Sequence, residues 1–243
     1  MNNSYIAVLD SGIGGISVLK DLIKVLPGEK FLYFGDNGNA PYGNKTIDEL
    51  TVISKRNIDL IKRYPVKCLV LGCNTLSVNI IYSIMRYSGL PTFGVFPPVE
   101  RVSKNKKTLL LSTLRTAKTF TSSDNLHVLG LKNLVYDIEN NVGDLTKINI
   151  ERNLSLSEGF FINKKNYYDT IILGCTHYVF IKNKISDHFC PKNIISGNEY
   201  TVKAVLDFLQ NNKSLVNNKG FEVKFIGNFA VFNEHFYISS GQT

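Results

Sequence analysis

An internal repeat with an offset of 102 residues (171 − 69) divides this 243-residue chain. Residues 69–75 (LVLGCNT) recur as residues 171–177 (IILGCTH), and residues 6–11 (IAVLDS) recur at the same offset as residues 108–113 (TLLLST). Each copy is an apolar run that ends in polar residues. Two strand ends that recur in register predict two similar halves, each with its own sheet.

Short apolar runs alternate along the chain with segments of helical period. The apolar runs predict buried strands at residues 6–9, 31–34, 68–71, 109–111, 128–131 and 170–173. Apolar residues at three- and four-residue steps predict helices at residues 16–26, 47–64, 76–87 and 202–209. This alternation indicates an α/β fold with parallel sheets and right-handed crossovers.

The repeat also predicts the domain organisation. We expect two pseudo-symmetric α/β domains that face each other across a cleft, with the boundary near residues 93–107, where Pro97-Pro98 and a lysine cluster interrupt the pattern. The first domain would hold residues 1–95 and approximately 205–243, because the tail is expected to return to it. The second would hold residues 96–204.

Two of the four cysteines occupy equivalent places in the repeat. Cys73 and Cys175 each follow an apolar strand and a glycine, whereas Cys68 lies within a strand and Cys190 precedes a proline. Ligands of open α/β sheets bind beyond the carboxyl ends of the strands, so we expect both repeated thiols in one cleft. N–H groups at a helix start are expected to lower a thiol pKa from about 8.5 toward neutrality.

Paired thiols favour one kind of chemistry. A racemase removes a proton from one face of a carbon and returns one to the other, so it needs an acid and a base that exchange roles. This chemistry requires no metal. A cysteine hydrolase, by contrast, would need one thiol with a histidine base and no duplicate.

The segment at residues 10–15 (DSGIGG) lacks both the Gly-Lys-Ser/Thr of a nucleotide loop and the spacing of a dinucleotide fold. A carboxylate is therefore the expected anion, on a small-molecule substrate.

Charge and hydropathy limit the partners and the location. Lys and Arg number 28 against 20 Asp and Glu, for a net charge of +8, but the lysines are scattered, so we expect no nucleic-acid partner. No apolar run approaches the roughly 20 residues of a membrane span, and residues 1–5 do not resemble a signal peptide. Four cysteines without a CxxC pair predict reduced thiols in the cytoplasm.

Several blocks of this sequence resemble the cofactor-independent glutamate racemases of the aspartate/glutamate racemase superfamily. The matches span nearly the whole chain in the expected order. The specific blocks are residues 9–19, 33–36, 40–43, 73–75 and 173–178, and weaker matches occur at Thr113, Thr116, residues 196–199 and residues 236–241.

The resemblance implies an isomerase that interconverts L- and D-glutamate without pyridoxal phosphate and supplies D-glutamate for bacterial peptidoglycan. Cys73 and Cys175 match the two proton-transfer thiols, Asp10 matches a carboxylate near the first, and His177 matches a histidine beside the second. The positions that match the family's substrate-binding residues are Ser11, Pro41, Tyr42, Gly43, Asn74, Thr75, Thr113, Thr116 and Thr176.

The family also carries a glutamate beside the second cysteine, in a segment that this chain preserves poorly. Our alignment gives Glu139, with Asp137, Asp144 and Glu151 as nearby alternatives.

Other functions stay open at this point. An aspartate racemase, another two-cysteine isomerase or decarboxylase of the superfamily, and a ligand-binding relative without catalysis all fit the paired-cysteine pattern. The family often dimerises, so a homodimer is one of the states that the resemblance allows.

Overall fold

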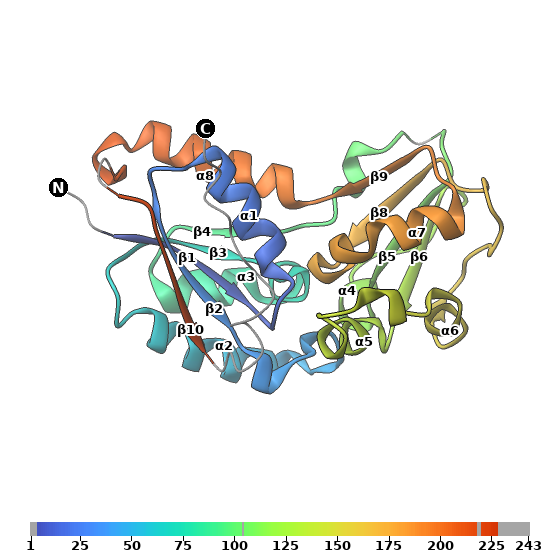
Figure 1. Ribbon diagram of the computed structural model, residues 1–243, viewed down its shortest axis with the longest axis horizontal. Coiled ribbons are helices and arrows are strands. Elements are labelled where there is room, and N and C mark those ends of the chain that lie inside the picture. The colour runs from blue at the N-terminus through green and yellow to red at the C-terminus, as the bar shows by residue number, and fades with distance from the viewer. Residues whose placement is uncertain (1–3, 104, 218–219, 228–243) are drawn as a thin grey trace.

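The computed structural model describes residues 4–103, 105–217 and 220–227 and confirms the α/β fold class. Two five-stranded sheets lie in two halves of the molecule, on the left and the right of Figure 1. The first sheet has the order β10-β2-β1-β3-β4, with β1 (Tyr5–Asp10), β2 (Lys30–Gly35), β3 (Val66–Leu71), β4 (Thr92–Gly94) and β10 (Glu222–Gly227). The second has the order β7-β6-β5-β8-β9, with β5 (Thr108–Thr113), β6 (Leu126–Leu131), β7 (Glu158–Gly159), β8 (Thr170–Gly174) and β9 (Asn193–Ser196).

The repeat seen in the sequence is also present in the strand register. Ile6 of β1 pairs with Cys68 of β3, and Thr108 of β5 pairs with Thr170 of β8, so both pairings obey the 102-residue offset. One prediction needs correction, because the sheets are not wholly parallel. The two-residue strand β7 runs antiparallel to β6 at the edge of the second sheet.

Helices cover both faces of the first sheet (Figure 1). The apolar side chains of β1 alternate between the faces, as they must in a strand buried on both sides. Ile6 and Val8 pack with α1 (Gly15–Val25) and α8 (Asn198–Asn211). Ala7 and Leu9 pack with α2 (Ile47–Ile61) and α3 (Asn74–Ser88).

Local signals explain where these helices begin and end. Thr46 and Glu49 form a capping box at the start of α2, with reciprocal bonds of 2.7 and 3.2 Å. α3 ends at Gly89, whose φ of 67° suits a left-handed cap. α3 begins at Asn74, two residues earlier than expected, so Cys73 lies at its N-cap.

Short helices connect the strands of the second half, and the sequence patterns did not predict them. They are the α-helices α4 (Leu114–Ala117), α5 (Leu134–Asn140), α6 (Ile150–Ser155) and α7 (Lys182–Phe189). Short 3-10 helices occur in both halves at η1 (Asn37–Asn39), η2 (Tyr42–Asn44), η3 (Val99–Arg101), η4 (Leu145–Lys147), η5 (Thr176–Ile181) and η6 (Lys213–Leu215).

The chain passes between the sheets twice, between β4 and β5 and between β9 and α8. The two connections touch at Gly197, where a Cβ atom would collide with the backbone oxygen of Phe96. The division into 1–95 with 205–243 and 96–204 remains a proposal, and α8, which packs on α1, lies across its second boundary. Residues 228–243, including the 236–241 match, lie outside the described residues.

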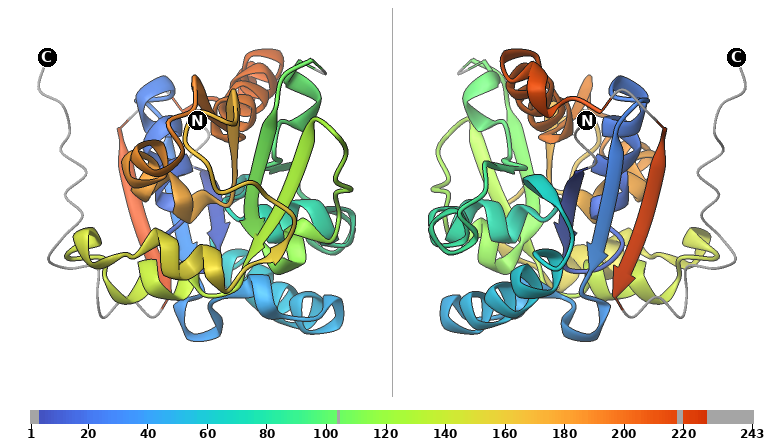
Figure 2. Two further views of the ribbon diagram at one scale, coloured as in Figure 1. Left: turned by 90° about the vertical axis from the view of Figure 1, so that its right-hand side faces the viewer. Right: turned by 90° about the vertical axis from the view of Figure 1, so that its left-hand side faces the viewer.

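A buried ion pair stabilises the segment that precedes β10. Strand β10 itself lies beside β2 at the edge of the first sheet (Figure 2). Lys67 Nζ lies 2.6 Å from Glu29 Oε2 and donates to the Leu215 carbonyl oxygen at 2.6 Å. The Asn217 N–H donates to Glu29 Oε1. In the described part of the chain, no helix has the length and apolar character to cross a membrane.

Candidate active site

The carboxyl ends of equivalent strands bring both repeated cysteines to the junction between the halves. Cys73 follows β3 and precedes α3, and Cys175 follows β8 and precedes η5. Each cysteine is only 6% exposed. Cys175 is among the groups that raise the pKa of Cys73, although burial contributes most, so the two thiols interact electrostatically. The structure therefore places both predicted thiols in one buried region.

Cys175 is the first member of a hydrogen-bonded chain of three side chains. Its Sγ lies 3.8 Å from Nδ1 of His177, and Nε2 of His177 lies 2.6 Å from Oε1 of Glu139. His177 is 1% exposed, and Glu139 reaches it from α5. A thiol, an imidazole and a carboxylate in this order form a unit in which the carboxylate orients the ring.

The electrostatics of this chain favour a charged histidine. Burial acts to lower the pKa of His177, but its hydrogen bonds to Cys175 and Glu139 outweigh burial and raise that pKa well above 6.5. Burial likewise acts to raise the pKa of Glu139, but the hydrogen bonds that it accepts, the one from His177 foremost, lower it. A charged His177 donates one N–H to Glu139 and directs the other at the Cys175 sulfur.

Glu139, the residue that the alignment gave, is the carboxylate that contacts this histidine, and the three nearby alternatives have other surroundings. Asp137 instead accepts a bond of 2.8 Å from the Asn153 side chain. Asp144 caps its own turn by accepting from the Thr146 N–H. Glu151 lies in the first turn of α6.

Cys73 has a different environment, dominated by Asp10. Asp10 is fully buried at the end of β1, and its Oδ2 accepts from the Gly12 N–H at 3.0 Å. Its Oδ1 is buried and has no hydrogen-bond partner among the described residues. Burial raises the pKa of Asp10, while the charge of His177 acts in the opposite direction.

The expectation of a lowered thiol pKa is wrong for Cys73. Burial raises the pKa of this thiol above its ordinary value, and the Asp10 carboxylate raises it further. The N–H groups of Thr75 and Leu76 lower the pKa as the helix-start argument requires, but their effect is smaller. Desolvation of the buried sulfur therefore outweighs the favourable backbone dipoles at the helix start.

The glycines of the 10–15 loop permit the two halves to approach each other closely. A Cβ atom on Gly12 would collide with the Glu139 carboxylate, and one on Gly14 would collide with the His177 ring and the Thr176 hydroxyl. The backbone can then reach the second half, where the Ile13 N–H donates to Glu139 Oε1 at 2.9 Å. The loop therefore needs its glycines because side chains of the second half pack directly against them. Binding of a phosphate is not required to account for these glycines.

Three threonines form a hydroxyl cluster that spans the two halves. Thr75 lies 3.1 Å from Thr113 and 3.4 Å from Thr116, measured between Oγ1 atoms, and Thr113 lies 3.1 Å from Thr116. Nearby in sequence, the Asn74 amide donates to the Val95 carbonyl oxygen, and its buried Oδ1 has no partner in the described structure. These groups can bind a polar ligand that displaces their mutual contacts.

The Pro-Tyr-Gly turn belongs to the first half but contacts the second. A Cβ atom on Gly43 would collide with Thr113, so this turn also needs its glycine for a close approach. Tyr42 is buried, and its hydroxyl donates to Asp36 Oδ2 at 2.6 Å. Pro41 follows a cis peptide bond and precedes η2. The remaining predicted binding residues, Ser11 and Thr176, are both buried at strand ends.

Three contributors were not predicted from the sequence. The Asn37 side chain donates to Glu139 Oε2 at 3.3 Å, the Tyr33 hydroxyl donates to the Gly12 carbonyl oxygen at 2.8 Å, and the Asn57 amide donates to Asp36. Tyr33 belongs to the matched block at residues 33–36, so the resemblance could have identified it, whereas Asn57 lies outside the matched blocks. Asn37 had no such signal, because only the approach of the second half gives it a partner.

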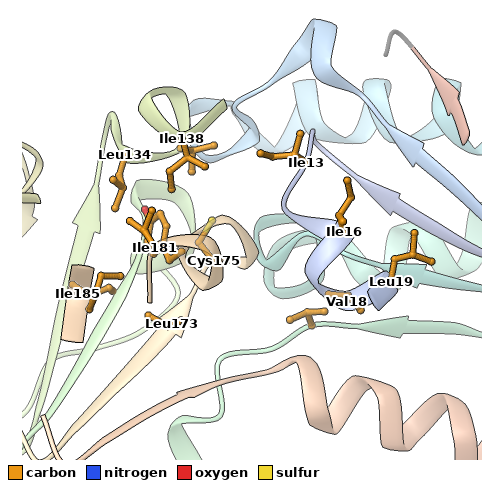
Figure 3. Packing of buried hydrophobic residues seen from close by; sticks show 14 of the residues in the cluster. Ile13, Ile16, Val18, Leu19, Leu134, Ile138, Leu173, Cys175, Ile181 and Ile185 are labelled. Carbon is orange, nitrogen blue, oxygen red and sulfur yellow. The ribbon is translucent and has the colours of Figure 1, made fainter. Parts of the chain in front are cut away.

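Apolar side chains from both halves surround this polar region. Figure 3 shows Cys175 near Ile181, with Ile138 and Ile13 on neighbouring segments of the two halves. Such an environment strengthens the electrostatic interactions among the buried groups. In the described part of the chain, no group of three or more His, Cys, Asp or Glu side chains is arranged to hold a metal ion.

The two thiols are therefore held in opposite electrostatic environments. Burial and the Asp10 carboxylate raise the pKa of the Cys73 thiol, whereas the His177 ring lies 3.8 Å from the Cys175 sulfur. One acid and one base in a common buried region can donate and accept protons on a molecule enclosed between them.

Comparisons with known proteins agree on one family. No protein-family model matches the chain. A glutamate racemase from Clostridium novyi is 34% identical over 196 residues, which cover 74% of this chain and 73% of that protein. A glutamate racemase from Clostridium botulinum (strain Kyoto / Type A2) is 30% identical over 242 residues, which cover 96% of this chain and 92% of the relative.

Solved structures give the same result. A glutamate racemase isoform from Bacillus anthracis matches with a TM-score of 0.78 at 27% identity, covering 93% of this chain and 89% of that one. A glutamate racemase from Francisella tularensis, solved in complex with D-glutamate, matches with a TM-score of 0.77 at 25% identity over the same shares.

Proposed function

The chain belongs to the glutamate racemase family, and we propose that it interconverts L- and D-glutamate by proton transfer between two cysteines, without pyridoxal phosphate. The observation that carries this proposal is the pair of buried thiols at equivalent strand ends, one beside Asp10 and one in the Cys175–His177–Glu139 chain. A single-base enzyme would have no use for the second, separately equipped thiol.

The proposed reaction has two proton transfers on opposite faces of Cα. From L-glutamate, the Cys175 thiolate takes the α-proton and becomes a thiol, and the electron pair stays on the substrate as a carbanion. The Cys73 thiol then donates its proton to the other face, which yields D-glutamate and the Cys73 thiolate. The reverse reaction exchanges the roles of the two thiols.

The α-proton is weakly acidic, so the site must also stabilise the developing charge. We assign this work to the N–H groups that follow Ser11, Cys73 and Cys175, together with Asn74 and Thr75. The unpartnered Asn74 Oδ1 is available to accept from the substrate ammonium group. The cluster of Thr75, Thr113 and Thr116 supplies further hydroxyls for a carboxylate.

Glutamate is the proposed substrate because the relatives that match are named glutamate racemases and one was solved with D-glutamate. We further propose that the enzyme acts in the cytoplasm and supplies D-glutamate for peptidoglycan.

The test is a racemisation assay of the purified protein, with no added cofactor, on both enantiomers of glutamate and of aspartate. Optical activity gives racemisation, and proton NMR in D₂O gives exchange at Cα. We expect loss of optical activity and Cα exchange with both glutamates. Racemisation of aspartate alone would show that aspartate, and not glutamate, is the substrate. Binding of glutamate without exchange at Cα would identify a ligand-binding relative.

A further inference from the structure

The carboxylate that orients His177 is held by both halves of the molecule. Glu139 lies on α5 of the second half, as does its partner His177 on η5. Its other two hydrogen bonds among the described residues come from the first half, from the Ile13 N–H at 2.9 Å and from the Asn37 amide at 3.3 Å. Each carboxylate oxygen thus receives one donor from across the junction.

The Asn37 side chain has no other described reason for its position. It extends from η1, between β2 and the Pro-Tyr-Gly turn, and its buried Oδ1 has no partner in the described structure. A buried, unpaired amide oxygen costs free energy, so the bond from Nδ2 to Glu139 must offset it. The opposite amide orientation would place an oxygen against the carboxylate, which fixes the assignment of the donor.

Each cysteine is only 6% exposed, so groups around the thiols must move to admit a ligand, and a separation of the two halves is the movement that would uncover both thiols together. Separation would break the bonds from Ile13 and Asn37. It would leave intact the 2.6 Å bond between Glu139 and His177, since both residues lie in the second half. The opened molecule would therefore keep the carboxylate and the ring together but lose two of the donors that fix the carboxylate.

We propose that Asn37 is a positioning residue that completes the Cys175–His177–Glu139 chain only when the halves close, so that this proton-transfer arm is fully assembled around an enclosed substrate. The inference rests on the proposed function. Asn37 acts through Glu139 and His177 and does not touch the substrate.

Kinetic asymmetry tests this role. Because the enantiomers have equal free energies, any variant lowers kcat/KM equally in both directions, so rates alone cannot locate the defect. The primary isotope effect, measured with C2-deuterated substrate, can locate the defect. A weakened Cys175 arm makes its proton removal slower than the Cys73 step, so the isotope effect should rise with L-glutamate and fall with D-glutamate.

The variants are Asn37→Ala, which removes the donor, and Asn37→Asp, which places a second carboxylate against Glu139. The control is Asn44→Ala, because Asn44 also makes a bond across the halves, to the Lys132 carbonyl oxygen at 3.5 Å, but does not contact Glu139. We expect kcat/KM to fall about 10-fold in Asn37→Ala and about 100-fold in Asn37→Asp, with the asymmetric isotope effects. Asn44→Ala should stay within about twofold of the wild type.

A second readout does not depend on racemisation. The His177 proton in the short bond to Glu139 should give a protected, downfield NMR signal in the wild type and in Asn44→Ala, and should broaden in Asn37→Ala. Unchanged isotope effects, or an unchanged signal in Asn37→Ala, would overturn the inference. An inactive wild type whose signal still responds to Asn37 would instead reject the proposed function and leave the positioning role standing.

Discussion

At the residue scale, two thiols of the same chemical type have unlike neighbours. Asp10 raises the pKa of Cys73, after burial, whereas His177 directs a donor at Cys175. Neither effect could be read from the strand-glycine-cysteine pattern that the two share. The difference arises from which side chain each half brings to the junction.

The ion pair between Glu139 and His177 gives a prediction of pH dependence. Replacing Glu139 by Gln removes the anion, so the unfolding free energy should fall by about 3 kcal/mol at most, a cost typical of a broken buried pair. Because the pKa of Glu139 is lowered, this group stabilises the fold above pH 4.5, the ordinary pKa of a glutamate. That stabilisation is lost as pH falls through the lowered pKa. The raised pKa of His177 adds stability below 6.5, and this is lost as pH rises through the raised pKa.

The difference between the wild type and Glu139→Gln should therefore be largest between about pH 4.5 and 6.5 and should shrink on either side. Urea denaturation of both proteins from pH 3 to 9 measures it. A constant difference across this range would mean that the two groups are not paired as ions.

The repeat predicted Cys73 and Cys175 as site residues, and the family resemblance added Asp10, His177 and Glu139. Neither gave any sign of Asn37. The contact of Asn37 with Glu139 joins residues 102 positions apart in the sequence and crosses between the two halves. No local pattern records that contact.

At the element scale, the glycine loop between β1 and α1 packs directly against the second half. Gly12→Ala should place a methyl group in the Glu139 carboxylate and lower kcat/KM about 100-fold while the protein stays folded. Gly38→Ala is the matched control, since no atom lies within 4 Å of its added Cβ. Kinetics and far-ultraviolet circular dichroism measure both. Equal activities in the two variants would show that the close packing at Gly12 is dispensable.

The central strands and the long helices of the first half followed from apolar periodicity, because burial on one or two faces leaves a regular pattern. Apolar periodicity did not predict the edge strands β4, β7 and β9 or the helices α4 to α6. They span two to seven residues, too few for a period to be recognised, and tertiary contacts decide their conformation.

At the scale of the whole molecule, the 102-residue offset predicted two related sheets, and the matching registers confirm them. The sequence did not indicate how tightly the halves would enclose the thiols. That closeness results from three glycines, Gly12, Gly14 and Gly43, each packed against a side chain of the other half.

The buried pair of Lys67 and Glu29 should stabilise the fold without affecting catalysis. Lys67→Met leaves the Glu29 carboxylate buried without its cation and should lower the unfolding free energy by about 3–5 kcal/mol. Lys24→Met, in the exposed pair with Asp21, should cost less than about 1 kcal/mol. Denaturant titration measures both, and kcat/KM well below the unfolding temperature should match the wild type. A Lys67→Met protein as stable as Lys24→Met would contradict this role.

The most direct test of the central claim follows the optical activity of L- and D-glutamate with the wild type, Cys73→Ser and Cys175→Ser. The two-thiol account predicts that the wild type brings both enantiomers to the racemate and that each serine variant loses at least about 1000-fold in kcat/KM in both directions. Retention of wild-type racemisation by either variant would contradict it.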